Sequence, residues 1–395
     1  MNKVRVGVIG AGFIGKVHIE ALRRLGFVDV AAVSEKDQAA ADAVAAELRV
    51  AKAYGSSEDL IKDKDLDAVH IATLNHLHYP LAKKALEAGK HVLCEKPLAM
   101  NSAEAKDLLD TATKAGRVHA ICHNMRYYPL VKQARSMVRA GEVGDIRLVH
   151  GQYLQDWLFL ETDYNWRLIA AVGGKSRAVA DIGTHWMDAV QHITGQRIVA
   201  VYADLTTFLP VRKKPKVEVA TYVVKELKPE DYEDVKIDTE DHGTLMFRMS
   251  GGAKGVLLVC QVAAGRKNFI HFEINGSKRS LEWNGEEPNT MRVGERGRPN
   301  GEFIKDPVLF YPDAARYGYA PCGLGEGYLD TFRSIFGDFH SWILAGKRMD
   351  VAKANFPTFF TGLSELNIVD AVLESARTGK WVDVKYQADF GPAYL

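Results

Sequence analysis

The first residues whose types and spacing suit chemistry form a glycine cluster near the N-terminus. Gly10, Gly12 and Gly15 stand in the order G-x-G-x-x-G, directly after a short apolar run. In this motif the first glycine makes a tight turn, the second lets the backbone approach a pyrophosphate, and the third lets a helix pack on its strand. Glu35 ends the next β-rich run, where an acid can accept hydrogen bonds from ribose hydroxyls. A purely structural turn is the alternative, but the strand before, the helix after and the acid favour a dinucleotide site.

A second candidate is Lys96, which stands between Glu95 and Pro97 after the apolar run 91–94. Most lysines are solvated surface residues, and that is the alternative reading here. The proline has a fixed φ and biases the residue before it towards extended backbone. Lys96 therefore has a defined direction, as a catalytic group requires.

A third candidate is the triplet Asp181, His185 and Asp188, which falls at helical spacing if residues 181–192 are helical. Residues at i, i+4 and i+7 share one face of a helix. A carboxylate one turn from an imidazole can orient it or share a substrate hydroxyl with it. Taken alone, such a triplet is more often a solvated helix face.

The elements that must position these residues alternate between strand and helix over residues 1–123. Such alternation predicts a doubly wound parallel sheet with helices on both faces, which binds ligands beyond the carboxyl ends of its strands. The segments 73–78 and 95–98 follow two of these strands, and we expect both to be loops that carry chemistry. The expected strands are 3–9, 28–34, 67–72, 91–94 and 117–122, with helices that include 38–48 and 81–87.

The combination of the glycine motif, N-H-L-H at 75–78 and G-K-H-V-L-C-E-K-P-L at 89–98 resembles the Gfo/Idh/MocA family of nicotinamide-dependent oxidoreductases. The resemblance covers essentially the whole chain and is strongest over 3–200. It implies an N-terminal Rossmann domain and a C-terminal α/β domain with a large open, mainly antiparallel sheet. It also implies an activity on sugars or cyclitols. The family carries D-x-G-x-H-x-x-D at the position of the third candidate, so the implied catalytic residues are Lys96, Asp181 and His185.

We therefore predict a hydride transfer between a nicotinamide cofactor and a secondary alcohol or ketone of a sugar or cyclitol. Glu35 favours NAD over NADP because a 2′-phosphate would meet its carboxylate, although Lys36 could hold that phosphate instead. The residues assigned to the cofactor are Gly10, Gly12, Phe13, Ile14, Gly15, Ser34, Glu35, Lys36, Thr73, Asn75, His76, His78, Glu95, Lys96 and Asn124. The residues assigned to the substrate are Arg126, Tyr127, Asp156, Trp157, Asn165 and Arg167, with core packing the alternative for Trp157.

The second half of the chain changes its period. We expect a dinucleotide-binding domain over 1–123 and a substrate-binding and oligomerisation domain over 124–395, whose C-terminal segment can pack back on the first domain. Apolar residues on both faces of 255–259 predict a homodimer or homotetramer joined sheet to sheet. The charged segment 209–239 reads as a surface loop, and 284–320 as turn-rich. Expected strands are 146–156, 197–208, 242–249, 255–262, 269–275 and 278–283; expected helices lie within 124–145, near 325–345 and near 361–377, before an irregular tail.

Composition sets bounds on these readings. The chain has 395 residues, 47% of them apolar, and a net charge of +1, so nothing indicates nucleic acid or a membrane as a partner. The cysteines are far apart, without C-x-x-C, which favours free thiols in a reducing cytoplasm over disulfides or a metal site. The N-terminus begins as a strand, and no signal peptide or membrane helix is expected.

Two rival functions and one departure from the family remain open at this level. A glycosidase of the same fold, which oxidises, eliminates and re-reduces with bound NAD, needs the same pocket. A non-enzymatic sensor could dispense with the lysine and the histidine, and both are present. Lys175 and Arg177 stand where many relatives have small residues. They could bind an anionic substrate group, but we favour pairing with acids at a subunit interface.

Overall fold

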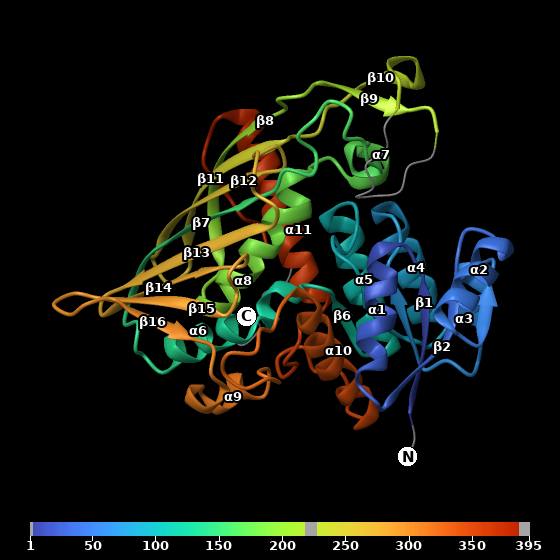
Figure 1. Cartoon of the computed structure of the whole chain (residues 1–395), viewed down its shortest axis with the longest axis horizontal. Helices are drawn as coiled ribbons and strands as arrows, with labels where there is room; N and C mark the ends of the chain where they lie inside the picture. The colour runs from blue at the N-terminus through green and yellow to red at the C-terminus, as the bar shows by residue number, and fades with distance from the viewer. Residues whose placement is uncertain (1–2, 218–226, 387–395) are drawn as a thin grey trace. The chain divides into compact units, whose positions relative to one another are not determined.

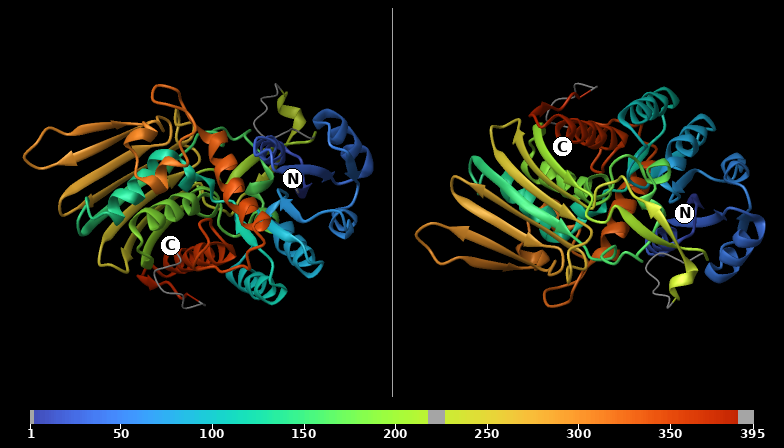
Figure 2. Two further views of the ribbon diagram at one scale, coloured as in Figure 1. Left: turned by 90° about the horizontal axis from the view of Figure 1, so that it is seen from below. Right: turned by 90° about the horizontal axis from the view of Figure 1, so that it is seen from above.

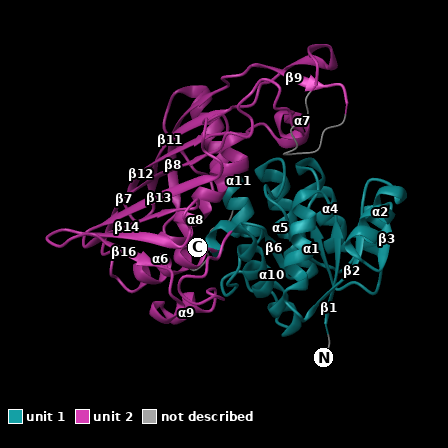
Figure 3. Cartoon of the chain, in the orientation of Figure 1, with its two compact units in different colours: residues 1–127, 328–366, 389–394 teal, residues 128–327, 367–388, 395 magenta. Residues whose placement is uncertain are grey.

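The computed structural model describes residues 3–217 and 227–386, which fold as two units (Figures 1 and 3). Of the described residues, unit 1 contains those up to 127 and residues 328–366, and unit 2 contains those within 128–327 and residues 367–386. The predicted irregular tail from 387 onward lies outside the described residues.

Unit 1 is built on a six-stranded parallel sheet in the order β3-β2-β1-β4-β5-β6. This is the strand order of a Rossmann fold, and its direction of winding reverses between β1 and β4. The strands are Val4–Ile9 (β1), Val28–Ser34 (β2), Lys52–Tyr54 (β3), Ala68–Ile71 (β4), His91–Cys94 (β5) and His119–Ile121 (β6). The helices are Phe13–Arg23 (α1), Gln38–Leu48 (α2), Ser57–Lys62 (α3), Asn75–Glu87 (α4), Ser102–Ala115 (α5), the 3-10 turn Asn124–Tyr127 (η1) and Tyr328–Leu344 (α10).

The strands and helices that the sequence predicts for unit 1 are confirmed except at two places. Strand β3 is missing from them because it has three half-buried residues and no apolar run. The segment 75–78 was expected to be part of a loop, but it is the first turn of α4, which contains Pro80. Helix α11, Phe359–Thr378, begins in unit 1 and ends in unit 2.

Unit 2 is built on a nine-stranded sheet in the order β16-β15-β14-β13-β7-β12-β11-β8-β17 (Figure 2). Every neighbouring pair is antiparallel except β12 and β7, which run parallel. The strands are Ile146–Leu154 (β7), Ile198–Thr206 (β8), His242–Met249 (β11), Lys254–Cys260 (β12), Phe269–Gly276 (β13), Arg279–Asn284 (β14), Thr290–Glu295 (β15), Gly301–Ile304 (β16) and Val382–Asp383 (β17). The turn-rich segment 284–320 therefore contributes β15 and β16, a correction to the sequence reading.

Helices pack on one face of this sheet, with α8 against β7 and β13 and α6 against β14. Trp186 of α8 is buried there, and its indole donates to the carbonyl of His271 at 2.7 Å. The helices and turns of unit 2 are Pro129–Arg139 (α6), Trp166–Leu168 (η2), Ala170–Gly173 (α7), the π-turn Val179–Gly183 (η3), Thr184–Thr194 (α8), Pro229–Asp231 (η4), Pro307–Leu309 (η5) and Pro312–Ala315 (α9).

The segment 209–239 is not wholly a surface loop, as the sequence reading expected. Val211–Pro215 (β9) and Tyr232–Lys236 (β10) form an antiparallel pair. The charges that suggested a solvated loop pair across it, because Lys213 lies opposite Asp234 and Lys214 opposite Glu233, at 2.5 and 2.8 Å. Cross-strand pairs of opposite charge stabilise a two-stranded ribbon.

Candidate functional site

The glycine loop of unit 1 leaves room for a ligand at the N-terminus of α1. A Cβ on Gly12 would meet nothing within 4 Å, whereas a Cβ on Gly15 would lie 2.0 Å from the carbonyl oxygen of Gly10. Gly10 itself has a φ of +82°, which disfavours any side chain. Among the described residues no side chain caps α1 and no acid stands in its first turn, so the positive end of its dipole favours a phosphate here. Phe13 is half exposed beside this opening, and Ile14 follows it in the first turn.

Glu35 lies at the carboxyl end of β2, next to the glycine loop. Its Oε1 accepts from the backbone N–H of Ala11 at 2.5 Å, which holds the carboxylate at the turn that β1 makes into α1. Two other polar atoms assigned to the cofactor are buried, namely Ser34 Oγ at the end of β2 and His76 Nδ1 in the first turn of α4. Neither has a hydrogen-bond partner among the described residues. Lys36 is exposed. The open loop and these unpaired donors and acceptors fit a dinucleotide with a ribose near Glu35.

His78 contacts both segments that follow β4 and β5, at Thr73 and at Pro97. This buried residue of α4 lies with Nδ1 2.7 Å from the Pro97 carbonyl oxygen and Nε2 3.2 Å from that of Thr73. Burial lowers the pKa of His78, so its ring is neutral and donates one proton. Asn75 is buried at the start of the same helix. His78 thus braces the segment that presents Lys96, whose peptide bond to Pro97 is cis.

Glu95 begins a buried chain of imidazoles behind Lys96. His18 Nε2 lies 3.0 Å from Glu95 Oε1, His18 Nδ1 lies 3.0 Å from His70 Nδ1, and His70 Nε2 lies 2.9 Å from His340 Nε2. A carboxylate only accepts, so with one proton per ring each histidine donates towards Glu95. Burial acts to raise the pKa of Glu95, but the hydrogen bond from His18 and the charge of Lys96 lower it to about 2. A fixed negative charge therefore precedes Lys96.

One group in the described part of unit 1 has the residue types of a metal site. Ligand atoms of His18, Glu95 and Cys122 lie within 4.8 Å of one another. Both nitrogens of His18 already have hydrogen-bonding partners, and burial raises the pKa of the Cys122 thiol well above its ordinary value. A metal binds the thiolate, so this environment disfavours one. We assign no metal here.

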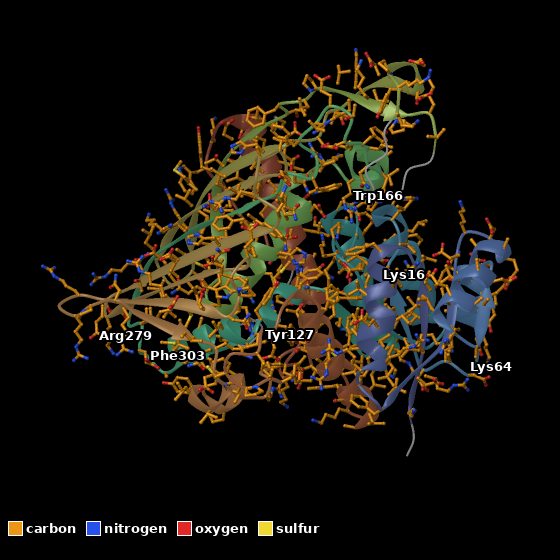
Figure 4. The ribbon with its side chains drawn as sticks, in the orientation of Figure 1. Lys16, Lys64, Tyr127, Trp166, Arg279 and Phe303 are labelled. Carbon is orange, nitrogen blue, oxygen red and sulfur yellow. The ribbon has the colours of Figure 1, made fainter. Side chains whose placement is uncertain are left out.

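The three candidate residues of η1 are buried in unit 1. Asn124 Nδ2 donates to Thr331 Oγ1 of α10 at 2.8 Å. The hydroxyl of Tyr127, labelled in Figure 4, lies 3.2 Å from Asp338 Oδ2 and 3.1 Å from the Asn355 carbonyl oxygen. Arg126 is 7% exposed. The structure therefore places the Tyr127 hydroxyl among protein atoms, in the packing role that competes with substrate binding.

In unit 2, Asp181 lies in the π-turn η3 and His185 in the first turn of α8. Residues 181–192 are therefore helical, as the spacing of the triplet required, but they are not one regular α-helix, because the chain adopts one wide π-turn before α8 begins at Thr184. Asp181 Oδ2 accepts from Gln261 Nε2 at 2.8 Å, and Oδ1 lies 3.5 Å from Arg167 Nε. His185 is buried, with the ring of Tyr153 6.5 Å away, and Asp188 is buried one turn later.

Arg167 is held beside Asp181 by Asn165, the residue that precedes the turn η2. Asn165 Oδ1 accepts from the backbone N–H of Arg167 at 3.1 Å and from its Nη1 at 3.3 Å. The guanidinium lies 4.3 Å from the ring centre of Trp166, labelled in Figure 4, and 6.0 Å from that of Trp157. The structure therefore brings four predicted residues together, namely Trp157, Asn165, Arg167 and Asp181.

Asp156 and Trp157 have different partners. Asp156 Oδ2 accepts from Lys267 Nζ at 2.6 Å and from the backbone N–H of Gly265 at 3.0 Å, which places this carboxylate on a turn. The hydrogen bond from Lys267 lowers the pKa of Asp156. Trp157 Nε1 donates to Gln155 Oε1 at 2.9 Å, and part of its ring packs on a small buried cluster. No described contact joins Asp156 to the Asp181 group.

Lys175 and Arg177, the departures from the family pattern, have separate environments. Lys175 is exposed. Arg177 is buried and forms an ion pair with Asp241 of the same unit. The pairing with an acid is as expected, but the acid belongs to the same chain and not to a subunit interface.

Several residues of the Asp181 group were missed by the sequence reading. Gln155 Nε2 and Tyr153 Oη both donate to Asn268 Oδ1, at 2.9 and 2.7 Å, and Gln261 reaches Asp181 from the end of β12. Gln261 was included in an expected strand over 255–262, where its polar side chain after an apolar run was the available signal.

Comparison with known proteins decides the family. The profile of the oxidoreductase family with an NAD-binding Rossmann fold matches residues 4–123, and that of the GFO/IDH/MocA C-terminal domain matches residues 131–282. The chain belongs to the Gfo/Idh/MocA family. It is therefore an oxidoreductase-family protein with an NAD-binding Rossmann fold, as the sequence predicted.

Relatives within the family include sugar and cyclitol dehydrogenases. Levoglucosan dehydrogenase of Pseudarthrobacter phenanthrenivorans is 31% identical over 97% of this chain and 99% of that protein. A structure of levoglucosan dehydrogenase in complex with NADH and levoglucosan matches with a TM-score of 0.85 at 29% identity, covering 97% of this chain and 99% of that one. An inositol dehydrogenase homolog from Azotobacter vinelandii, complexed with NAD⁺, matches with a TM-score of 0.85 at 25% identity over 97% of both chains. Among the described helices of the present chain, none has the length and apolarity to cross a bilayer.

Proposed function

We propose that this protein is an NAD-dependent dehydrogenase that oxidises a secondary alcohol of an uncharged sugar, anhydrosugar or cyclitol. The observation that carries the proposal is the group around Asp181. It combines a carboxylate, a guanidinium, carboxamides and two tryptophan rings, which are the polar and aromatic groups that suit a ligand with several hydroxyls. The relatives named for levoglucosan and inositol support the same substrate class.

The ion pairs that the cations near Asp181 and Asp156 already make support an uncharged substrate. Arg167 lies beside Asp181, and Arg177 and Arg212 both contact Asp241. Lys267 pairs with Asp156. Each of these cations already has a carboxylate partner, so a substrate phosphate or carboxylate would have to displace an existing ion pair.

In this proposal Lys96, Asp181 and His185 act on the same hydroxyl group. The nicotinamide ring supplies the hydride acceptor when the cofactor is bound. His185 takes the hydroxyl proton, and Asp181 contacts that hydroxyl or orients the imidazole. Lys96 donates to the oxygen as negative charge develops on it, which stabilises the alkoxide where it forms. The glycine loop and Glu35 hold the pyrophosphate and the ribose.

The test is an absorbance assay for NADH or NADPH formation with purified protein. The panel contains levoglucosan, L-sorbose, myo-inositol and free hexoses, each compared with an anionic counterpart such as a hexose phosphate or a uronic acid. We expect turnover with at least one neutral compound and NAD, and no gain from the added anionic group. Absence of reduction across the panel, or a clear preference for the anionic member of a pair, would contradict the proposal.

A further inference from the structure

Gln261 joins Asp181 to a buried arginine. The side chain is fully buried after β12, with Nε2 donating to Asp181 Oδ2 at 2.8 Å and Oε1 accepting from Arg177 Nη1 at 3.0 Å. An arginine can only donate and a carboxylate only accepts, so chemistry fixes which way the amide points. The donor end of Gln261 therefore always faces Asp181.

Arg177 is in turn held from three sides. Its Nε donates to Thr239 Oγ1 at 3.2 Å and its Nη2 pairs with Asp241. Asp241 also accepts from Arg212 Nη2 at 2.9 Å, and the side chains of all three charged residues are at most 1% exposed. Each of these three charged side chains has an ion-pair partner, although Arg212 Nε has no hydrogen-bond partner among the described residues, and breaking one of the ion pairs would strand a buried charge. The arginine that donates to Gln261 Oε1 is therefore itself held in one position.

The backbone that carries Asp181 is fixed from the same side. Glu240 Oε1 accepts from the N–H groups of Arg177 and Val179 at 2.9 and 3.0 Å and from Ser176 Oγ at 2.7 Å. The N–H of Asp181 then donates to the Arg177 carbonyl oxygen at 2.7 Å, in the first part of the π-turn. Residues 239–241 and 261 therefore set both the backbone and the carboxylate of Asp181.

We propose that Gln261 is a positioning residue, which holds the Asp181 carboxylate ionised and in one orientation, and that Arg177 acts through it. The inference rests on the proposed function, in which Asp181 contacts the substrate hydroxyl. By donating to Oδ2, Gln261 directs Oδ1 towards Arg167 and the substrate. Arg177 is then part of the catalytic geometry without touching the substrate.

The first arm of the test uses Gln261→Met, which keeps the length of the side chain and removes both hydrogen bonds. We expect kcat to fall about 10-fold to 10²-fold, because a small misplacement of a catalytic group costs that much. The KM for NAD should change little. In an Asp181→Asn background, Gln261→Met should have no further effect on kcat, since both changes act on the same carboxylate.

The second arm uses Gln261→Glu, which has the same shape and places a second carboxylate beside Asp181. Two close carboxylates cannot both ionise easily, so one pKa rises. The acid limb of the pH profile of kcat/KM should move to higher pH, because Asp181 must then lose its proton beside a second carboxylate. Gln133→Met is the matched control, because Gln133 is a buried glutamine of α6 whose Oε1 accepts from the backbone N–H of Tyr311 at 2.9 Å. It should leave the pH profile where it is.

The outcomes separate this inference from the proposed function. If the wild type lacks turnover, or Asp181→Asn keeps full kcat, the proposed function fails. If Asp181→Asn loses activity but Gln261→Met does not, or their effects on kcat multiply, only the positioning role fails. Crystal structures of wild type and Gln261→Met decide the case without activity: we expect the Asp181 carboxylate to rotate, and an unchanged carboxylate would overturn the inference.

Discussion

Lys96 differs from its neighbours in one respect that bears on catalysis. Every other residue from Cys94 to Ala99 is buried, whereas the Lys96 side chain is partly exposed at the carboxyl edge of the parallel sheet. The buried carboxylate of Glu95 precedes it, and His78 braces the proline that follows. A partly exposed lysine on a segment whose other residues are buried and held in place suits a group that stabilises developing charge.

Removal of the acid–base groups is the first prediction. Lys96→Ala and His185→Ala should each lower kcat at least about 10²-fold, the usual contribution of a positioned proton-transfer group. The dissociation constant for NAD should change much less. Lys106→Ala is the control, because Lys106 pairs with Asp110 on the surface of α5. Near-full turnover in either variant would remove that residue from the proposed chemistry.

Cofactor choice is the second prediction, and it concerns Glu35. The carboxylate is tied to the glycine loop by the Ala11 N–H, so a 2′-phosphate would meet a fixed negative charge. Wild type should have the higher kcat/KM with NAD, and Glu35→Ser should move the ratio towards NADP. Lys36→Ala tests whether the exposed lysine contributes. A wild-type preference for NADP, or a ratio that Glu35→Ser leaves unchanged, would exclude Glu35 as the selector.

Which residues could be predicted from the sequence depends on how local their signal is. The sequence predicts roles for the glycines, Glu35 and Lys96 because each lies at a strand end within a short motif, and these roles stay predictions. Gln261 was missed because it comes 80 residues after Asp181 along the chain, and nothing local marks the contact. Partners that only the tertiary fold brings together carry no short-range pattern.

At the scale of elements, the strands of unit 2 had local sequence signals, whereas the turn that precedes α8 had none. Alternation and hairpin glycines predicted β11 exactly and its neighbours within a few residues. The π-turn before α8 was not predicted, because the spacing of Asp181, His185 and Asp188 was interpreted on the condition of a regular helix over residues 181–192. The N–H groups of Arg177 and Val179, at the start of this turn, donate to Glu240 Oε1, and this acceptor lies about 60 positions away along the chain, where no local pattern marks it.

The third prediction concerns the buried histidine of β6. His119 Nδ1 accepts from the N–H of Phe359, the first residue of α11, at 3.1 Å. Burial lowers the pKa of His119 from 6.5 to about 3. Between these values the unfolded chain binds a proton that the folded chain does not, so stability falls as the pH falls from 6.5 towards 3. Each such group contributes a slope of about 1.4 kcal/mol per pH unit.

His119→Gln keeps an acceptor for the Phe359 N–H and removes the titration. The free energy of unfolding, measured by denaturant at a series of pH values, should therefore fall less steeply below pH 6.5 than in wild type. His150→Gln is the control, because the His150 side chain is 38% exposed. Equal slopes in wild type and His119→Gln would show that His119 is not protonated on unfolding.

At the scale of the whole molecule, the nine-stranded sheet has one face without helices of its own unit in the described structure (Figure 2). Met246 of β11 and Val256 of β12 lie directly opposite each other and are 41% and 40% exposed. Leu148 of β7 adds a third apolar side chain at 39%. The strand 255–259 thus has apolar residues pointing to both faces, as the sequence indicated, although His150 and Glu273 make the open face mixed in character.

The last prediction is that this face joins copies of the chain. Apolar side chains gathered on an open sheet face are typical of an interface, because monomers rarely leave a large apolar patch in water. Light scattering at micromolar concentration should give the mass of a dimer or tetramer. Val256→Glu should shift the population towards monomer, since a buried, unpaired carboxylate strongly disfavours association. Val308→Glu is the matched control, because Val308 is 89% exposed and lies outside the sheet. A monomeric wild type, or equal effects of the two substitutions, would contradict assembly through the sheet.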